Sequence, residues 1–288
     1  MSLAILSGGS GWHVQDLLRA AQAVSCEAVA VDFRSLSIAA PNPSRRTSAL
    51  DGFRNVIVRT MPAGSLEQIV LRMDILAAAS DNGVSVVNPP RSLEVCVDKL
   101  LTNVRLVRAG LPVPRTVACQ RADEAMPAFH ALGGDVVVKP LFGAEGRGIV
   151  RITDVELAWR TFRTLESTSS VMYIQQTIQH PGWDARAFVI AGRVVAAMKR
   201  TAAGDWRTNI AQGGVATAME LAAPEVALAL DAAQATGCVI AGVDLIQNQR
   251  GEWFVLEVNA VPGWRALAEV CHIDIAAAVL RTALEHRP

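Results

Sequence analysis

Apolar runs of strand length alternate with helix-like segments over the first ninety residues. Four of these runs predict buried strands: Leu3–Leu6, Ala28–Phe33, Asn55–Arg59 and Val84–Val87. Helices are predicted from about Val14 to Val24 and again in the stretch that ends near Ala79. Because strands that alternate with helices are typical of a parallel sheet, we expect a small α/β domain here. Ligands bind such sheets beyond the carboxyl ends of the strands, where Arg59 and Thr60 lie.

The polar and glycine-rich segments between the apolar runs indicate how the chain is divided. After Pro90, Ser92 is a suitable N-cap for one helix that carries Lys99 and ends before Gly110. Further on, residues 224–236 are predicted as a helix that ends at Gly237, and a last helix starts near Asp274. We predict three domains: residues 1–90, residues 91–170 and residues 171–288.

A hairpin with a glycine-rich loop follows in the second predicted domain. Its strands are Asp135–Lys139 and Ile149–Ile152, and its loop carries Gly143, Gly146 and Gly148. Glycine costs conformational entropy, so three in one loop suggest a close approach of the backbone to phosphate oxygens. Lys139 at the strand end suits the same purpose, because nucleotide enzymes neutralise phosphate charge with lysine. An ordinary flexible loop is the alternative.

A second hairpin, over residues 239–262, is the strongest candidate for a metal site. If Arg250 and Gly251 form a two-residue loop, Asp244 lies opposite Glu257, and Asn259 shares their face. The residues expected to face the core instead are Val243, Leu245, Phe254, Leu256 and Val258. Opposed carboxylates destabilise a hairpin unless a proton or a cation lies between them, and this oxygen set suits Mg²⁺. A surface hairpin with scattered acids is the alternative.

Three arginines cluster in the segment that precedes this hairpin. Arg186, Arg200 and Arg207 lie in or beside two predicted strands that are otherwise rich in Val, Ala and Phe, and Asp184 shares a strand face with Arg186. Surface arginines are usually solvated, but their apolar surroundings favour a functional cluster here.

Composition and charge exclude several classes of protein. Lys+Arg and Asp+Glu both total 27, so no net charge directs the chain to nucleic acid or to an anionic membrane. The five cysteines are scattered without metal-binding spacing, which is typical of reduced thiols. The start has no basic region before an apolar one, and no apolar run has the length of a membrane span. We therefore expect a cytoplasmic protein, and we predict a homo-oligomer.

Taken in order, these motifs resemble those of the ATP-grasp carboxylate–amine ligases. The matching segments are DKL, VVKPLFGAEGRGI, IQQTI, DARAFVIAGRVVAAMKR, GDWRTNIAQGG, AGVDLI and FVLEVNAVPG, within about residues 95 to 283. Within that group the chain looks most like the RimK-type glutamate ligases. The resemblance implies an ATP-grasp fold preceded by an N-terminal α/β domain.

The resemblance also implies roles for individual residues around ATP and Mg²⁺, which Mn²⁺ could replace. The nucleotide phosphates would be contacted by Lys99, Lys139, Arg207 and Asn209, with the loop of Gly143, Gly146 and Gly148 closing over them. Asp184 would lie near the ribose, and Arg200 would stabilise an acyl phosphate. The metal ligands would be Asp244, Glu257 and Asn259.

Two positions depart from the family pattern. Gln176 stands where a glutamate is usual, although its amide oxygen can still accept a hydrogen bond from the adenine amino group. The segment from Val261 to Arg265 also differs, which predicts an acceptor other than the one RimK uses. Arg186, Arg265 and the turn at Gly8–Gly11 are the candidate substrate contacts.

The predicted activity is amide formation in two steps, in which ATP phosphorylates a carboxylate and an amine then displaces phosphate. Such chemistry depends on positioning and charge stabilisation, which lysines, arginines and Mg²⁺ supply. By resemblance the amine is glutamate by default or another amino acid, and the acceptor is a small-molecule cofactor or a carrier. The alternatives are a kinase that uses the same ATP site and an ATP-binding regulatory protein without turnover.

Overall fold

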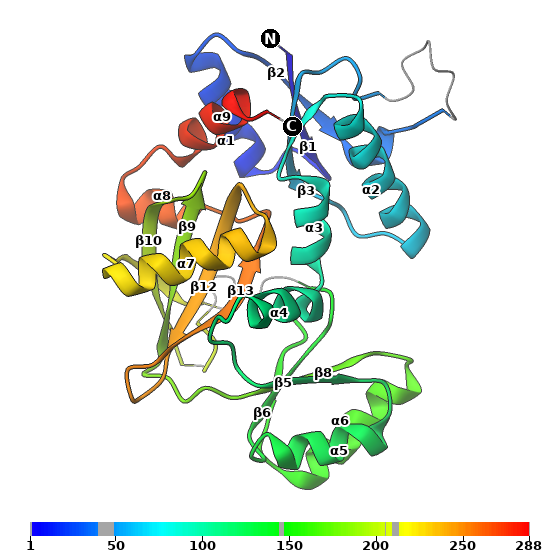
Figure 1. The fold of residues 1–288 in the computed structure, drawn as a ribbon, viewed down its shortest axis with the longest axis vertical. Coiled ribbons are helices and arrows are strands. Elements are labelled where there is room, and N and C mark those ends of the chain that lie inside the picture. Colours follow the sequence, from blue (N-terminus) through cyan, green and yellow to red (C-terminus); the bar gives the residue numbers. More distant parts are fainter. Residues whose placement is uncertain (1, 40–48, 144–146, 205, 209–212, 288) are drawn as a thin grey trace.

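The computed structural model describes residues 2–39, 49–143, 147–204, 206–208 and 213–287. Within these ranges the strands form three sheets, and along the long axis of the molecule the sheet that is third in the chain lies between the other two (Figure 1). Among the helices in these ranges, none has the length and apolar character needed to cross a bilayer.

The first sheet is parallel, as the alternating pattern predicted. Its strands have the order β2-β1-β3-β4: β1 (Ser2–Ser7), β2 (Glu27–Asp32), β3 (Asn55–Thr60) and β4 (Ser85–Val87). A short 3₁₀ turn, η1 (Phe33–Ser35), follows β2. Helices α1 (Trp12–Ala23) and α9 (Ile275–Glu285) cover one face, and α2 (Leu66–Asp81) covers the other. The C-terminal helix therefore packs beside the N-terminal helix (Figure 1).

Two helices connect this sheet to the rest of the chain, where the sequence predicted one. They are α3 (Pro90–Val97) and α4 (Lys99–Arg108). The helical conformation is interrupted at Asp98. The carboxylate of this residue accepts hydrogen bonds from two backbone amides of α4, at 2.8 and 3.0 Å. Asp98 is thus the N-cap of α4, and it puts Lys99 at the first helical position. The prediction of Ser92 as N-cap was wrong, because Pro90 already occupies the first turn of α3.

The second sheet is antiparallel, in the order β5-β8-β6-β7. Its strands are β5 (Thr116–Cys119), β6 (Val136–Lys139), β7 (Val150–Ile152) and β8 (Met172–Gln176). Helices α5 (Ala122–Ala131) and α6 (Val155–Ser167) share a buried core with this sheet at one end of the molecule (Figure 1).

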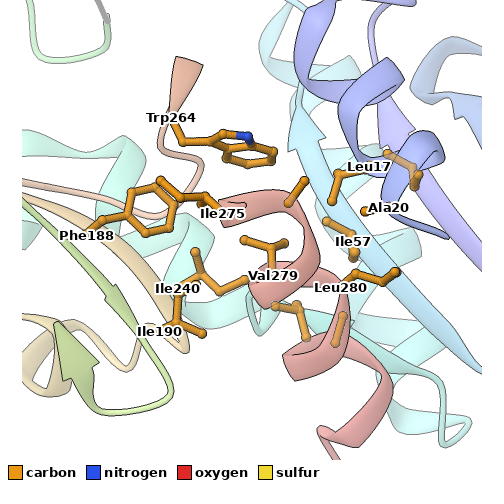
Figure 2. Packing of buried hydrophobic residues seen from close by; sticks show 14 of the residues in the cluster. Leu17, Ala20, Ile57, Phe188, Ile190, Ile240, Trp264, Ile275, Val279 and Leu280 are labelled. Carbon is orange, nitrogen blue, oxygen red and sulfur yellow. The ribbon is translucent and has the colours of Figure 1, made fainter. Parts of the chain in front are cut away.

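The third sheet is also antiparallel, in the order β11-β10-β9-β12-β13. Its strands are β9 (Trp183–Ile190), β10 (Arg193–Thr201), β11 (Val215–Ala218), β12 (Ile240–Gln247) and β13 (Trp253–Asn259). One face packs against α7 (Ala223–Thr236), which ends at Gly237 with a φ of 72°, as predicted. The other face packs on α8 (Arg265–Cys271) and α9, so that Phe188 and Ile190 share a core with Trp264, Ile275 and Val279 (Figure 2).

The β12–β13 hairpin confirms the predicted pairing but not the predicted loop. Asp244 is the register partner of Glu257. Toward the loop the register shifts by one residue, so that Leu245 pairs with Val255 and the loop is longer than two residues. A bulge at Leu256 compensates for the longer loop. The prediction that Leu256 faces the core was therefore wrong: Val255 is buried there, and Leu256 lines a cavity.

Asn88 holds this hairpin against the end of the first sheet. Its side-chain amide donates to the carbonyls of Ile240 (2.7 Å) and Ala260 (2.6 Å) and accepts from the amides of Val239 and Ile240. With all four bonds made in a buried position, Asn88 fixes the hairpin relative to β4. The limits of the three predicted domains remain predictions.

Candidate functional site

A cavity of about 250 Å³ lies where the second and third sheets face each other, at the ends of β6, β8, β9, β10, β12 and β13. It brings together most of the residues predicted for the site, which are Lys99, Lys139, Gly143, Gln176, Asp184, Arg200, Arg207, Asp244 and Glu257. Gly146 and Asn209 lie outside the described residues. The predicted residues Gly148, Arg186, Asn259 and Arg265 are described but do not line the cavity.

Two lysines enter the cavity from different elements. Lys99, at the start of α4, donates to the carbonyl of Gly143 (2.8 Å), which joins α4 to the glycine-rich loop. Lys139, at the end of β6, donates to the side-chain oxygen of Gln175 (2.6 Å). Burial lowers the pKa of both ammonium groups, and that of Lys139 falls to about 8. Both lysines are therefore in a place where a bound anion would stabilise their charged form.

Gln175 is a site residue that was not predicted from the sequence. The family pattern predicts a nucleotide contact only at the neighbouring Gln176. Strand alternation puts the two side chains on opposite faces of β8. Gln175 is buried and orients Lys139, and both glutamines line the cavity, Gln176 with a partly exposed side chain.

The arginines on the third sheet form a buried network with two aspartates. Arg186 makes a two-point fork with Asp244, in which both hydrogen bonds are 2.7 Å long. Arg200 makes a second fork with Asp184 (2.7 and 2.5 Å) and also reaches Asp244 (3.0 Å). Because β9, β10 and β12 are antiparallel neighbours, these side chains all point away from α7.

Electrostatics keeps this network ionised. Burial alone would raise the pKa of Asp244, but the charges of Arg186 and Arg200 hold it at about 2. Burial opposes the charge on Arg200 as well, and Asp244 and Asp184 outweigh that effect and raise its pKa. The Nη1 group of Arg200 makes no hydrogen bond to any described residue, so it keeps donors for a ligand.

The donors expected to hold a metal are compatible with Mg²⁺. Three of the about four lone-pair sites of the Asp244 carboxylate take arginine hydrogens, which leaves about one. Asn259 accepts from the amide of Val261 (2.8 Å) and also keeps one lone pair. Glu257 has no hydrogen bond or ion pair within the described residues, so its carboxylate is the most available ligand. One or two carboxylates plus phosphate oxygens is the usual environment of Mg²⁺.

The structure also shows the surroundings of three further predicted residues. The Asp184 carboxylate is committed to Arg200 and is buried. Gly148 has a φ of 70°, a conformation that glycine adopts at little cost, so this end of the loop does require glycine. Arg265 starts α8 at the surface, where it pairs with Glu269 (3.2 Å) and stacks over Trp12 (5.7 Å).

Comparison with known proteins identifies the family of the chain. A model of the RimK-like ATP-grasp domain matches residues 96–283. The chain is 33% identical over 253 residues to the tetrahydromethanopterin:alpha-L-glutamate ligase of Methanosarcina acetivorans, with 78% of each chain covered. It is 31% identical over 300 residues to the protein of the same name from Methanocaldococcus jannaschii, with 99% of each chain covered.

A solved structure confirms the predicted ATP-grasp fold. The ATP-grasp ligase PsnB, in complex with its minimal precursor, Mg and ADP, superposes with a TM-score of 0.75 at 20% identity. The superposition covers 98% of this chain and 96% of that chain. This likeness extends beyond the segment with sequence motifs and includes the N-terminal α/β sheet.

Proposed function

Because this chain belongs to the RimK-like ATP-grasp family of ATP-dependent carboxylate–amine ligases, we propose that it adds α-L-glutamate to tetrahydromethanopterin or a closely related acceptor. The observation that carries the proposal is the match to the Methanocaldococcus jannaschii ligase, which runs over 99% of both chains and therefore includes the acceptor-binding regions. In this reaction a carboxylate of the acceptor is phosphorylated by ATP, and the glutamate amine then displaces phosphate to form the amide.

The two lysines are assigned to the phosphates of the nucleotide. Lys99 and Lys139 reach the cavity from α4 and β6, and burial makes each of them gain from a phosphate counter-charge. Gly143 is bonded to Lys99, which couples the glycine-rich loop to the phosphate position. Gln176, Arg207 and Asn209 are the other proposed nucleotide contacts. Asp184 lines the cavity where the ribose is proposed to lie, with its carboxylate bonded to Arg200.

Glu257, Asp244 and Asn259 would hold Mg²⁺, which neutralises phosphate charge when it is bound. Glu257 supplies the carboxylate without a protein partner, and the two other residues each keep about one lone pair.

Arg200 is assigned to the transferred phosphoryl group. Its Nε and Nη2 atoms are fixed by Asp184 and Asp244, so its orientation is set before substrate arrives, and Nη1 remains as donor. Such preorganised donors stabilise developing charge at little reorganisation cost. Arg207, which also lines the cavity, is a further cation that favours a ligase over a kinase, because a ligase must also protect a reactive acyl phosphate.

The test is product analysis with the purified protein. Incubation with ATP, Mg²⁺, L-glutamate and tetrahydromethanopterin should release ADP in step with a product heavier by one glutamyl residue, measured by mass spectrometry. L-Aspartate, D-glutamate and L-glutamine in place of L-glutamate test the amine. ADP release with another amino acid but not with glutamate would contradict the assignment of glutamate, and light scattering of the same sample tests the predicted homo-oligomer.

A further inference from the structure

Arg59 is a buried cation at the carboxyl end of the first sheet. The register of β1 and β3 shifts between Leu6 and Ser7, so Arg59 is the extra residue of a bulge, a feature that re-aims side chains. Its side chain lies on the face of α1 and stacks over the indole of Trp264 (4.4 Å), while the residue is only 5% exposed.

No carboxylate pairs with Arg59 anywhere in the described residues, and its buried Nε has no hydrogen-bond partner there. Burial without a counter-charge lowers the pKa of Arg59 to about 9. Buried charges in proteins are normally paired, so this guanidinium is suited to a ligand that brings the negative charge.

Further donors lie beside Arg59, on α1. The Nε2 atom of His13 accepts from the amide of Trp264 (3.0 Å), so the proton of the neutral ring is on Nδ1, which is a donor. Helix α1 begins after Gly11 without a side-chain cap and without an acid in its first turn. The carboxylate that acts on His13, Asp16, is already engaged by Trp264 Nε1 (2.9 Å) and by Arg19 (2.8 Å). A helix N-terminus with these neighbours favours an anion.

This cluster is close to the arginine network of the third sheet. A methyl group added to Gly242 would lie 2.8 Å from Pro262 and 3.8 Å from Nε of Arg186. Pro262 and Trp264 are two residues apart, and such a segment spans at most about 7 Å. The Arg59 cluster therefore lies against the face of the third sheet that carries Arg186. Trp264 itself is buried against Phe188 and Ile275 (Figure 2), so its ring gives Arg59 a rigid support.

We infer that Arg59, His13 and the first turn of α1 bind an oxyanion, either carboxylate or phosphate, that the acceptor carries in addition to the carboxylate that reacts. The inference rests on the proposed function for the identity of the acceptor.

Calorimetric titration tests the site without requiring turnover. The probes are inorganic phosphate and glutarate, added in the presence of Mg²⁺ and AMP-PNP so that the proposed nucleotide site is filled. Wild-type protein should bind one of the probes, and Arg59→Met should weaken its affinity by about tenfold or more. The matched control is Arg163→Met, which removes an arginine stacked on Trp159 (5.4 Å) of α6 and should bind like wild type.

The probe that binds identifies the oxyanion as phosphate or carboxylate. Equal affinity in wild type and Arg59→Met, or no binding of either probe to wild type, would overturn the inference. If circular dichroism shows that Arg59→Met does not fold, His13→Ala replaces it and should also weaken binding, and unchanged affinity there would count against the site.

Steady-state kinetics then connects the site to the acceptor. In Arg59→Met the KM for tetrahydromethanopterin should rise about tenfold or more, while the KM values for glutamate and ATP stay unchanged. A selective rise in the KM for glutamate would overturn the assignment to the acceptor. If wild type has no activity with tetrahydromethanopterin, the proposed acceptor is wrong, and the titration still decides whether the oxyanion site exists.

Discussion

Lys139 should make nucleotide binding depend on pH. Burial lowers the pKa of its ammonium group from 10.5 to about 8 in the free protein. Phosphate oxygens beside it would restore the charged form and raise its pKa again, so binding is coupled to the uptake of a proton. The sign follows directly: affinity is full below about pH 8, where Lys139 is already charged, and is lost as pH rises above that value.

The size of the effect can be worked from that pKa. With a free-state pKa of about 8 and a bound-state pKa near the ordinary value, the dissociation constant should rise about tenfold between about pH 7 and about pH 9. Burial lowers the pKa of Lys99 as well, so its contribution has the same sign. Lys139→Arg should flatten the dependence, because arginine stays charged throughout this range.

Calorimetry with Mg²⁺ and AMP-PNP across this pH range measures both quantities. Repeating each titration in buffers with different ionisation enthalpies counts the protons taken up. A dissociation constant that does not change with pH in wild type would refute the reasoning. So would a Lys139→Met variant with the same decline as wild type, since the decline would then come from another group.

Three further results are expected. Glu257→Gln should abolish ATP turnover while circular dichroism shows an intact fold, because the most available metal ligand is lost; wild-type turnover would exclude this metal assignment. Arg200→Met should lower the free energy of unfolding by about 3–5 kcal/mol in urea titrations, because it leaves the Asp184 carboxylate buried without its fork; a change below about 1 kcal/mol, as for a surface pair, would argue against the network. The amides of Gly143 and Gly148 should exchange hydrogen more slowly when nucleotide is bound, and equal exchange in both states would count against a closing loop.

The sequence predicted the elements of the fold well where local patterns decide them. Alternating strands and helices predicted the parallel first sheet, and the glycine at position 237 correctly marked the end of α7. The prediction of one helix over α3 and α4 was wrong, because Asp98 caps a new helix at a position that an interior helical residue can also occupy. The hairpin loop was also wrong, since a loop extension and a bulge at Leu256 cancel and leave Asp244 opposite Glu257.

The sequence predicted which residues form the site, but it did not predict which of them bond to one another. Motif order identified most of the residues that line the cavity, among them Lys139 and Arg200. Which carboxylate each arginine bonds depends on the order of strands in the sheet, and β12 pairs with β9 across a long stretch of sequence. The Arg59–Trp264 contact was missed for the same reason, because it joins residues from opposite ends of the chain.

The most direct test of the central claim is to trap the activated carboxylate. Wild-type protein is incubated with ATP, Mg²⁺ and tetrahydromethanopterin, with hydroxylamine in place of glutamate, and the products are analysed by mass spectrometry. If the cavity activates a carboxylate as an acyl phosphate, hydroxylamine should attack it and give a hydroxamate in step with ADP release. Recovery of a stable phosphorylated product with no hydroxamate would contradict the ligase mechanism and indicate a kinase.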